Sequence, residues 1–396
     1  MQTIGILIVT ALVGAMLAWP RLAKAKLWRA SVTPLASIIG SGFLVLGPIL
    51  AQAYGLWAPL AMAALCAMAY AIGATIRFNI VAVDKRDHGS ISKHIETVSS
   101  WALSFAYIIS VAYYLNLLGA FAVSLTPWDT ALAARGVTST AFAVILIVGW
   151  TKGFTALERL EQIAVGVKLA IIGGLLFGLG WFFADTAQND ALVLSPAVTT
   201  GWAGIGLLFG LLVTVQGFET SRYLGQEYDA KVRVRSMRIA QGLSTAIYMI
   251  YVVFIAYVFD ATQIHTSETA IIDMMVLVAP ILPILLVFAA LAAQFSAAVA
   301  DTSGAGGLIY ELTKGRVSVK LGYVVLVSLG IAITWGADVF LIISWASKAF
   351  AVYYTLQALI AVVLAKRDGA GIVKVAFFCV IAMLCAVIAI FGAAVE

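Results

Sequence analysis

The sequence predicts an all-α integral membrane protein with about twelve transmembrane helices. Apolar side chains make up 63% of the 396 residues and charged side chains only 11%, and the mean hydropathy is +1.05. Soluble domains average about 25% charged residues. Apolar runs of spanning length recur along the chain, without the alternating pattern of a β-barrel. These observations exclude a cytosolic enzyme and a secreted disulfide scaffold.

The apolar runs define the predicted elements in chain order. The twelve runs are residues 3–20, 33–55, 57–80, 97–126, 138–150, 163–184, 201–224, 238–260, 273–304, 320–336, 339–365 and 372–394. A signal peptide begins with basic residues, whereas the basic residues near the first run follow it. We therefore expect this run to be a transmembrane anchor with the N-terminus outside.

The positive charges lie almost entirely on one side of the predicted topology. With the N-terminus outside, 21 of the 24 Lys and Arg residues fall in cytoplasmic gaps, and only Arg135 falls in an outside loop. This bias follows the positive-inside rule and predicts a multi-pass protein of the plasma or inner membrane. It also accounts for the net charge of +5, which therefore does not indicate nucleic-acid binding.

Two of the spans are interrupted by glycine near their centres. The 33–55 span reads IIGSGF at residues 38–43, and the 201–224 span reads VQGFET at residues 215–220. An unwound stretch exposes backbone N–H groups that favour an anion and carbonyl groups that favour a cation. Helix packing through small residues is the alternative explanation for each glycine taken singly.

The interrupted spans divide the chain into two halves. We expect residues 31–184 and 201–365 to form two five-helix repeats of inverted orientation, each beginning with an interrupted span. Residues 1–30 then hold an additional N-terminal helix with a basic loop, and residues 366–396 an additional C-terminal helix. Broken helices at matching positions of inverted halves are typical of a midplane transport site.

The segments around the interruptions resemble the amino acid–polyamine–organocation (APC) superfamily of transporters. IGSGF at residues 39–43, followed by LGP at 46–48, is similar to the first helix of that family. GFE at residues 217–219 is similar to its sixth helix, and GLIYELTK at 307–314 is similar to the loop after its eighth helix. The resemblance covers about residues 31–395.

This resemblance implies an inverted-repeat fold of five plus five helices, alternating access, and a substrate site at the interruptions. The backbone amides of Ser41 and Gly42 are expected to receive a carboxylate, and carbonyl groups near Ile38 and Val215 an amine. The expected site residues are Ile38, Gly40, Ser41, Gly42, Val215, Gln216, Gly217, Glu219, Tyr113, Asn116, Gln294 and Trp345, with Tyr114 and Ser296 as further candidates. Ordinary interhelical packing explains each side chain on the other helices equally well.

Four charged side chains fall inside predicted spans: Lys168, Glu219, Asp301 and Lys348. A charge at bilayer depth costs at least about 2.5–3.5 kcal/mol, so each is a functional hypothesis. The resemblance implies that Lys168 stands where sodium-dependent relatives hold a sodium ion and couples transport to protons, with Asp301 nearby. Snorkelling of Lys168 to the cytoplasmic interface and sodium coupling remain alternatives. Lys348 is expected to pair with Glu219 or Asp301, or to meet an acidic substrate.

The sequence contains no catalytic or metal-binding pattern. The nucleophile elbow and the Walker loop are both missing, and the three histidines lie in loops without metal spacing. We therefore expect no enzyme activity, no cofactor and no metal. The predicted function is proton-coupled import of an amino acid or related amine, with the substrate, protons and the lipid bilayer as partners. A carrier of an inorganic ion or nucleobase, a channel and a membrane-embedded enzyme are the alternatives.

Overall fold

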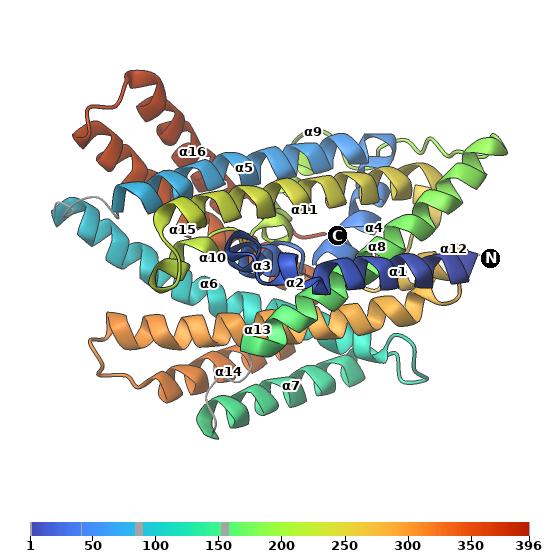
Figure 1. Cartoon of the computed structure of the whole chain (residues 1–396), viewed down its shortest axis with the longest axis horizontal. Coiled ribbons are helices and arrows are strands. Elements are labelled where there is room, and N and C mark those ends of the chain that lie inside the picture. The colour runs from blue at the N-terminus through green and yellow to red at the C-terminus, as the bar shows by residue number, and fades with distance from the viewer. Residues whose placement is uncertain (1, 41, 84–89, 152–157, 396) are drawn as a thin grey trace.

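The computed structural model describes residues 2–40, 42–83, 90–151 and 158–395, and Figure 1 shows them as a bundle of long helices. Within these ranges all regular elements are α-helices or short 3-10 helices. They are α1 (Gln2–Ala18), α2 (Pro20–Ala23), α3 (Lys26–Ile38), α4 (Gly42–Tyr54), η1 (Gly55–Trp57), α5 (Ala58–Val83), α6 (Ser90–Val123), α7 (Ala131–Thr151), α8 (Glu158–Gln188), α9 (Gly201–Gly210), η2 (Leu212–Val215), α10 (Thr220–Tyr223), η3 (Leu224–Gln226), α11 (Ala230–Val258), η4 (Ala261–Gln263), α12 (Ala270–Val278), α13 (Leu282–Leu312), α14 (Val319–Gly336), α15 (Val339–Arg367) and α16 (Ile372–Phe391). The all-α fold class is confirmed.

Membrane-length helices account for most of the predicted spans. In the part of the chain that the structure describes, nine helical stretches are long and apolar enough to cross a membrane, one of them running from α4 through α5. The other predicted spans are α1, which has 17 residues, and the two interrupted ones. The first interrupted span divides into α3 and α4, and the second into α9, η2 and α10. The protein is a multi-pass membrane protein.

The prediction of one helix over residues 273–304 is wrong. The chain forms α12 and α13 instead, and Ala279 between them is extended (φ −161°, ψ 137°). Ala279 precedes Pro280, and the proline ring disfavours helical geometry in the residue before it. Pro283 lies in the first turn of α13, where its missing N–H is not needed. Because α13 continues to Leu312, the segment 307–314 is mostly helix rather than the expected loop.

Contacts near the helix ends support the predicted assignment of gaps to the two ends of the bundle. At the end predicted to be cytoplasmic, the Lys26 ammonium lies 3.6 Å from the Asp229 carboxylate. Asp229 also accepts the N–H of Val232 at 2.9 Å, and this hydrogen bond, with Lys26, lowers the pKa of the Asp229 carboxyl below its usual value. At the other end, the Gln52 amide donates to the Thr266 hydroxyl at 2.8 Å.

Helix α6 forms the centre of the bundle. Within its most apolar stretch, 94% of the residues are buried, and α13 and α15 both pack along it. The additional terminal helices are peripheral: α1 packs on α8, and α16 packs on α15 and α9. The interrupted spans contact α5, α8, α11, α13 and α15, and α6 places Tyr113 and Tyr114 against them.

Candidate functional site

The first interruption separates α3 from α4. The α-helix ends at Ile38, and Ile39 (φ −84°, ψ 62°) leaves the helical conformation while its N–H still bonds to Leu35 O. A new helix begins at Gly42. The first N–H groups of any helix lack intrahelical partners, so α4 presents donors at this point. Ser41, which we expect to supply one of them, lies outside the described residues.

The second interruption is longer and contains a left-handed residue. After α9 ends at Gly210, the chain forms η2, and Gln216 is extended (ψ 179°). Gly217 has φ +116°, a conformation that side chains with a Cβ rarely adopt. The short helix α10 then begins at Thr220. The prediction that both spans are discontinuous is confirmed.

The two interruptions pack directly against each other. A Cβ on Gly217 would overlap Ser37, and one on Gly42 would lie 3.1 Å from Thr214. Tyr248 of α11 links the spans, because its hydroxyl shares a hydrogen bond between Ile38 O (3.0 Å) and Thr214 O (2.6 Å). Unwound backbone from both spans thus meets at one place inside the bundle.

Glu219 braces the second interruption. It is 1% exposed, and its Oε2 accepts the N–H of Gly217 at 3.0 Å and the hydroxyl of Tyr354 at 2.8 Å. The same hydroxyl lies 2.9 Å from Oε1 of Gln216. The carboxylate and the tyrosine thus replace backbone hydrogen bonds that the unwound chain lacks.

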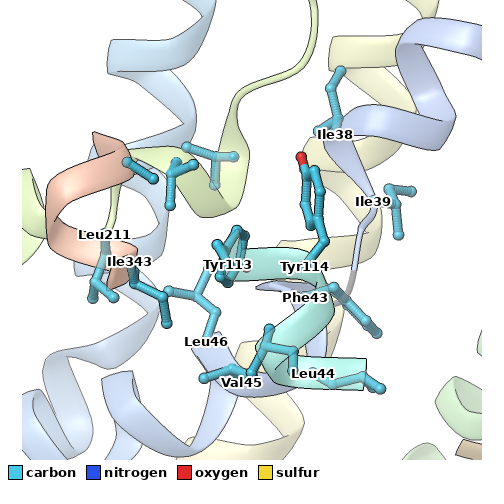
Figure 2. Close-up of a cluster of buried hydrophobic side chains, with 14 of the residues drawn as sticks. Ile38, Ile39, Phe43, Leu44, Val45, Leu46, Tyr113, Tyr114, Leu211 and Ile343 are labelled. Carbon is cyan, nitrogen blue, oxygen red and sulfur yellow. The ribbon is translucent and has the colours of Figure 1, made fainter. Parts of the chain in front are cut away.

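Aromatic rings from α6 pack against the first interruption. Figure 2 shows Tyr113 and Tyr114 beside the first interrupted span, with the Tyr114 hydroxyl directed toward Ile38. Their ring centroids are 5.1 Å apart, and a Cβ on Gly42 would lie 2.5 Å from the Tyr113 hydroxyl. Gln294 of α13 is fully buried, and neither end of its amide has a hydrogen-bond partner among the described residues.

The structure does not bring two of the expected site residues to the interruptions. Asn116 donates to Ala112 O (2.7 Å) and Thr334 (2.8 Å), so it joins α6 to α14. Trp345 is 38% exposed and lines a groove on the outside of the bundle. Ser347 lies two residues after Trp345 on α15, and residues two apart on a helix point to nearly opposite sides. Ser347 therefore faces the second interruption, whereas Trp345 faces outward.

Lys168 lies in a small cavity beside the first interrupted span. The side chain is 5% exposed, and its Nζ donates to Ala36 O at 2.9 Å. The cavity has a volume of about 30 Å³, and Ser296 and Asp301 of α13 also line it. Asp301 accepts a hydrogen bond from Ser110 of α6. A cavity of this size has room for about one water molecule, and is too small for an amino acid.

Lys168 lies at the expected depth in its span. Helix α8 begins at Glu158, and its apolar stretch begins at Ile163, as predicted. Lys168 therefore lies five residues into the apolar stretch, about 7.5 Å along the axis. Its 5% exposure and its bond to Ala36 O, rather than its depth, argue against snorkelling to the cytoplasmic interface.

The comparisons with known proteins agree with this geometry. Residues 20–392 match a family described as an APC superfamily transporter. The chain belongs to the APC superfamily of transporters. A protein of Aquifex aeolicus (strain VF5) named as an uncharacterized protein is 42% identical over 358 residues, which cover 86% of this chain and 85% of that protein. The comparison with this relative leaves the transported substrate open.

The fourth intramembrane charge of the transporter lies apart from the other three. Lys348 lines the same outer groove as Trp345, between α6, α14 and α15, and the rest of the groove is apolar. Among the described ion pairs, it joins neither Glu219 nor Asp301. Of the alternatives for Lys348, a pairing with one of these acids is therefore not found in the described part of this structure, and contact with an acidic substrate stays open. The place of Lys348 on the outer face of α15 directs it away from both acids.

A polar network closes the end of the transporter that is predicted to be cytoplasmic. Arg222 of α10 bonds to Glu96 of α6 at 2.7 Å and to Gln357 of α15. Gln357 in turn donates to Ser99 at 2.8 Å and accepts from Asn79 at 3.0 Å. The network thus ties the second interrupted span to three other helices.

Glu96→Ala is expected to loosen this closure. Removing the carboxylate deprives Arg222 of its ion-pair partner, so a maleimide reagent should reach a cysteine placed at buried Ser221 more easily. The native cysteines are first replaced by alanine. In this background we expect Glu96→Ala to raise the rate of maleimide labelling at position 221 about tenfold. This corresponds to about 1.4 kcal/mol, near the lower end for a hydrogen bond to a charged group. Glu311→Ala, at an exposed acid, is the control; equal rates in both variants would contradict the closure.

Tyr248→Phe is expected to weaken the contact between the interruptions. The variant leaves Ile38 O and Thr214 O without their shared donor, at a cost of about 1–3 kcal/mol for an unsatisfied buried group. We expect a lower thermal midpoint and a raised KM for uptake. Tyr257→Phe, which removes one hydrogen bond to Leu56 O outside the site, is the matched control. A KM equal to that of the control would show that Tyr248 does not shape the site.

Sequence reasoning missed several residues that hold the site together. Ser347 accepts the N–H of Val213 at 2.9 Å and donates to Gly210 O at 2.6 Å, and so fixes η2. Ser347 and Tyr354 lie seven residues apart on one face of α15. A stripe of hydroxyl groups at helical spacing within an apolar span was the signal for them. Within the described residues, no three His, Cys, Asp or Glu side chains lie close enough to bind a metal.

Proposed function

We propose that the transporter imports an amino acid or a related amine together with protons by alternating access. The observation that carries this proposal is the contact between the two interruptions, where unwound backbone from both spans meets inside the bundle. Helix N-terminal amides suit a carboxylate, and free carbonyl groups suit an amine. A zwitterion offers both charges within one small molecule.

Buried side chains on α6 and α13 support a small organic substrate. Tyr113 and Tyr114 offer aromatic faces, and Gln294 offers an amide whose donors and acceptor are not used within the described protein. Leaving such a group unpaired costs about 1–3 kcal/mol, which a bound substrate would recover. We assign Gln294 to the substrate and Asn116 to the packing of α6 on α14.

We propose that residues 31–184 and 201–365 are the two inverted repeats of the transporter. Each would begin with an interrupted span, α3–α4 in the first and α9–α10 in the second. The helices of residues 1–30 and 366–396 would be additions outside the repeats. The N-terminus would lie outside the plasma or inner membrane, which puts the basic loops in the cytoplasm.

Proton coupling is assigned to Lys168. Its ammonium bonds to Ala36 O between α8 and the first interrupted span, in a cavity too small for the substrate. When the cytoplasmic side opens, separation of α3 from α8 removes this acceptor and favours loss of the proton. An ammonium already occupies the position, which argues against a sodium ion there.

Uptake into liposomes tests the proposal. The purified protein is reconstituted and supplied in turn with labelled amino acids, amines and nucleobases, under an inward proton gradient or an inward sodium gradient. We expect uptake of at least one amino acid or amine that the proton gradient stimulates and a protonophore abolishes. Uptake of nucleobases alone, stimulation by sodium alone, or flux without saturation would contradict the proposal.

A further inference from the structure

A second, larger cavity lies between the N-terminal helices and α8. Its volume is about 480 Å³, and α1, α2, the start of α3 and residues 163–171 of α8 line it. In Figure 1, α1 crosses α8 before the chain turns through α2 into α3. The lining is largely apolar, with Arg29 at the end where α3 begins. This cavity is separate from the one at Lys168, although Val165 contributes to both walls.

The cavity exists because α1 and α8 diverge toward α2. At the far end the helices touch closely, since a Cβ on Gly174 would overlap Thr10. Further along, a Cβ on Gly14 would only contact Ala170, at 3.6 Å. At Gly166 no atom lies within 4 Å of a Cβ position. The two helices thus form a wedge that opens toward the basic loop.

The open end of the wedge carries a concentrated positive charge. Arg21, Lys24, Lys26 and Arg29 fall within nine residues. Lys26 pairs with Asp229, and the other three have no acidic residue among them in the sequence. The wedge from Thr10 to Leu17 corresponds to about 10 Å along α1, which fits within the roughly 15 Å of one leaflet's hydrocarbon. The site is therefore apolar at membrane depth and cationic at the membrane surface.

We propose that this cavity binds an anionic phospholipid of the cytoplasmic leaflet, with one acyl chain between α1 and α8 and the phosphate at Arg29. Basic pockets between transmembrane helices on this side suit such headgroups, and Trp28 lies at the cavity beside Arg29. A transmembrane helix of a second copy would cover the apolar wall but would not by itself bring a phosphate to Arg29. A soluble anion would leave the apolar wall without a partner.

Lipid binding to two variants tests this proposal. Arg29→Gln removes the charge at the cavity, and Gly166→Phe fills the wedge from a position with free space. Native mass spectrometry and thermal shift are used with dioleoyl phosphatidylglycerol, dioleoyl phosphatidylcholine and inorganic phosphate. We expect the preference for phosphatidylglycerol over phosphatidylcholine to fall about fivefold in Arg29→Gln, the effect of one basic residue near the surface. Gly166→Phe should lose the bound lipid.

Gly242→Phe is the matched control, because Gly242 is an exposed helical glycine on α11 with no atom within 4 Å of its Cβ position. It should retain the lipid. Lipid retention in Gly166→Phe equal to that in Gly242→Phe would overturn the proposal. Stabilisation by inorganic phosphate equal to that by phosphatidylglycerol would also overturn it, as would a loss of self-association in Gly166→Phe with the lipid still bound. If Gly166→Phe fails to fold, an unchanged lipid preference in Arg29→Gln still overturns it. None of these outcomes depends on which substrate is transported.

Discussion

Gly42→Leu is expected to reduce uptake to the level of empty liposomes while the protein still folds in the membrane. A Cβ at this position lies 2.5 Å from the Tyr113 hydroxyl and 3.1 Å from Thr214, so a larger side chain pushes the two interruptions apart. Overpacking of this kind costs typically 1–3 kcal/mol. If the site only shifts, this cost still corresponds to a fall of about 5-fold to 160-fold in kcat/KM. Uptake and the size-exclusion profile of the purified variant provide the measurement.

Gly136→Leu is the control for this prediction. Gly136 is an exposed helical glycine on α7, with no atom within 4 Å of its Cβ position, so the same substitution adds the same bulk without a clash. It should transport like the unaltered protein. If Gly42→Leu retained the unaltered KM and rate, the substrate could not lie at the contact between the interrupted spans.

The interruptions were predictable from the sequence because their causes are local. Glycine weakens a helix wherever it occurs, and IGSGF and VQGFET concentrate that weakness at the middle of two apolar spans. The buried charges were equally visible, since Lys168 and Glu219 stand out in apolar surroundings. Composition and period thus predicted where the backbone opens and that Lys168 and Glu219 lie within the apolar spans.

The partners of these residues could not be predicted, because they depend on how distant helices pack. Tyr248 lies 210 residues from Ile38, and Tyr354 lies 135 residues from Glu219. Helical period shows that Tyr354 and Ser347 share a face, but not which neighbour that face meets. The same limit explains Lys348 and Trp345, whose side of α15 is turned outward. The sequence allowed the depth of Lys348 in the membrane to be estimated. It did not show which side of α15 the lysine lies on.

Lys168→Ala is expected to abolish the stimulation of uptake by an inward proton gradient. The substitution removes the one ammonium that bonds to Ala36 O, so the contact between α8 and the first interrupted span no longer depends on a proton. We expect the remaining uptake, driven by the substrate gradient alone, to show a flat pH profile. Lys348→Ala is the matched control, since it removes an intramembrane lysine from the outer groove and should retain the stimulation. A steep profile retained in Lys168→Ala would exclude coupling through this residue.

A double variant separates the coupling role of Lys168 from its structural role. Lys168 and Asp301 line the same small cavity, so removing only the lysine leaves a buried carboxylate without its nearby cation. Such a loss typically costs 3–5 kcal/mol, whereas replacing both members of a buried pair by uncharged residues of similar volume is often nearly neutral. Lys168→Ala with Asp301→Asn should therefore recover part of the thermal stability, the rest being the cost of the cavity left by alanine, while uptake remains insensitive to the proton gradient. Recovery of stability together with proton stimulation would assign the coupling to another group, and no recovery would show that the two charges do not interact.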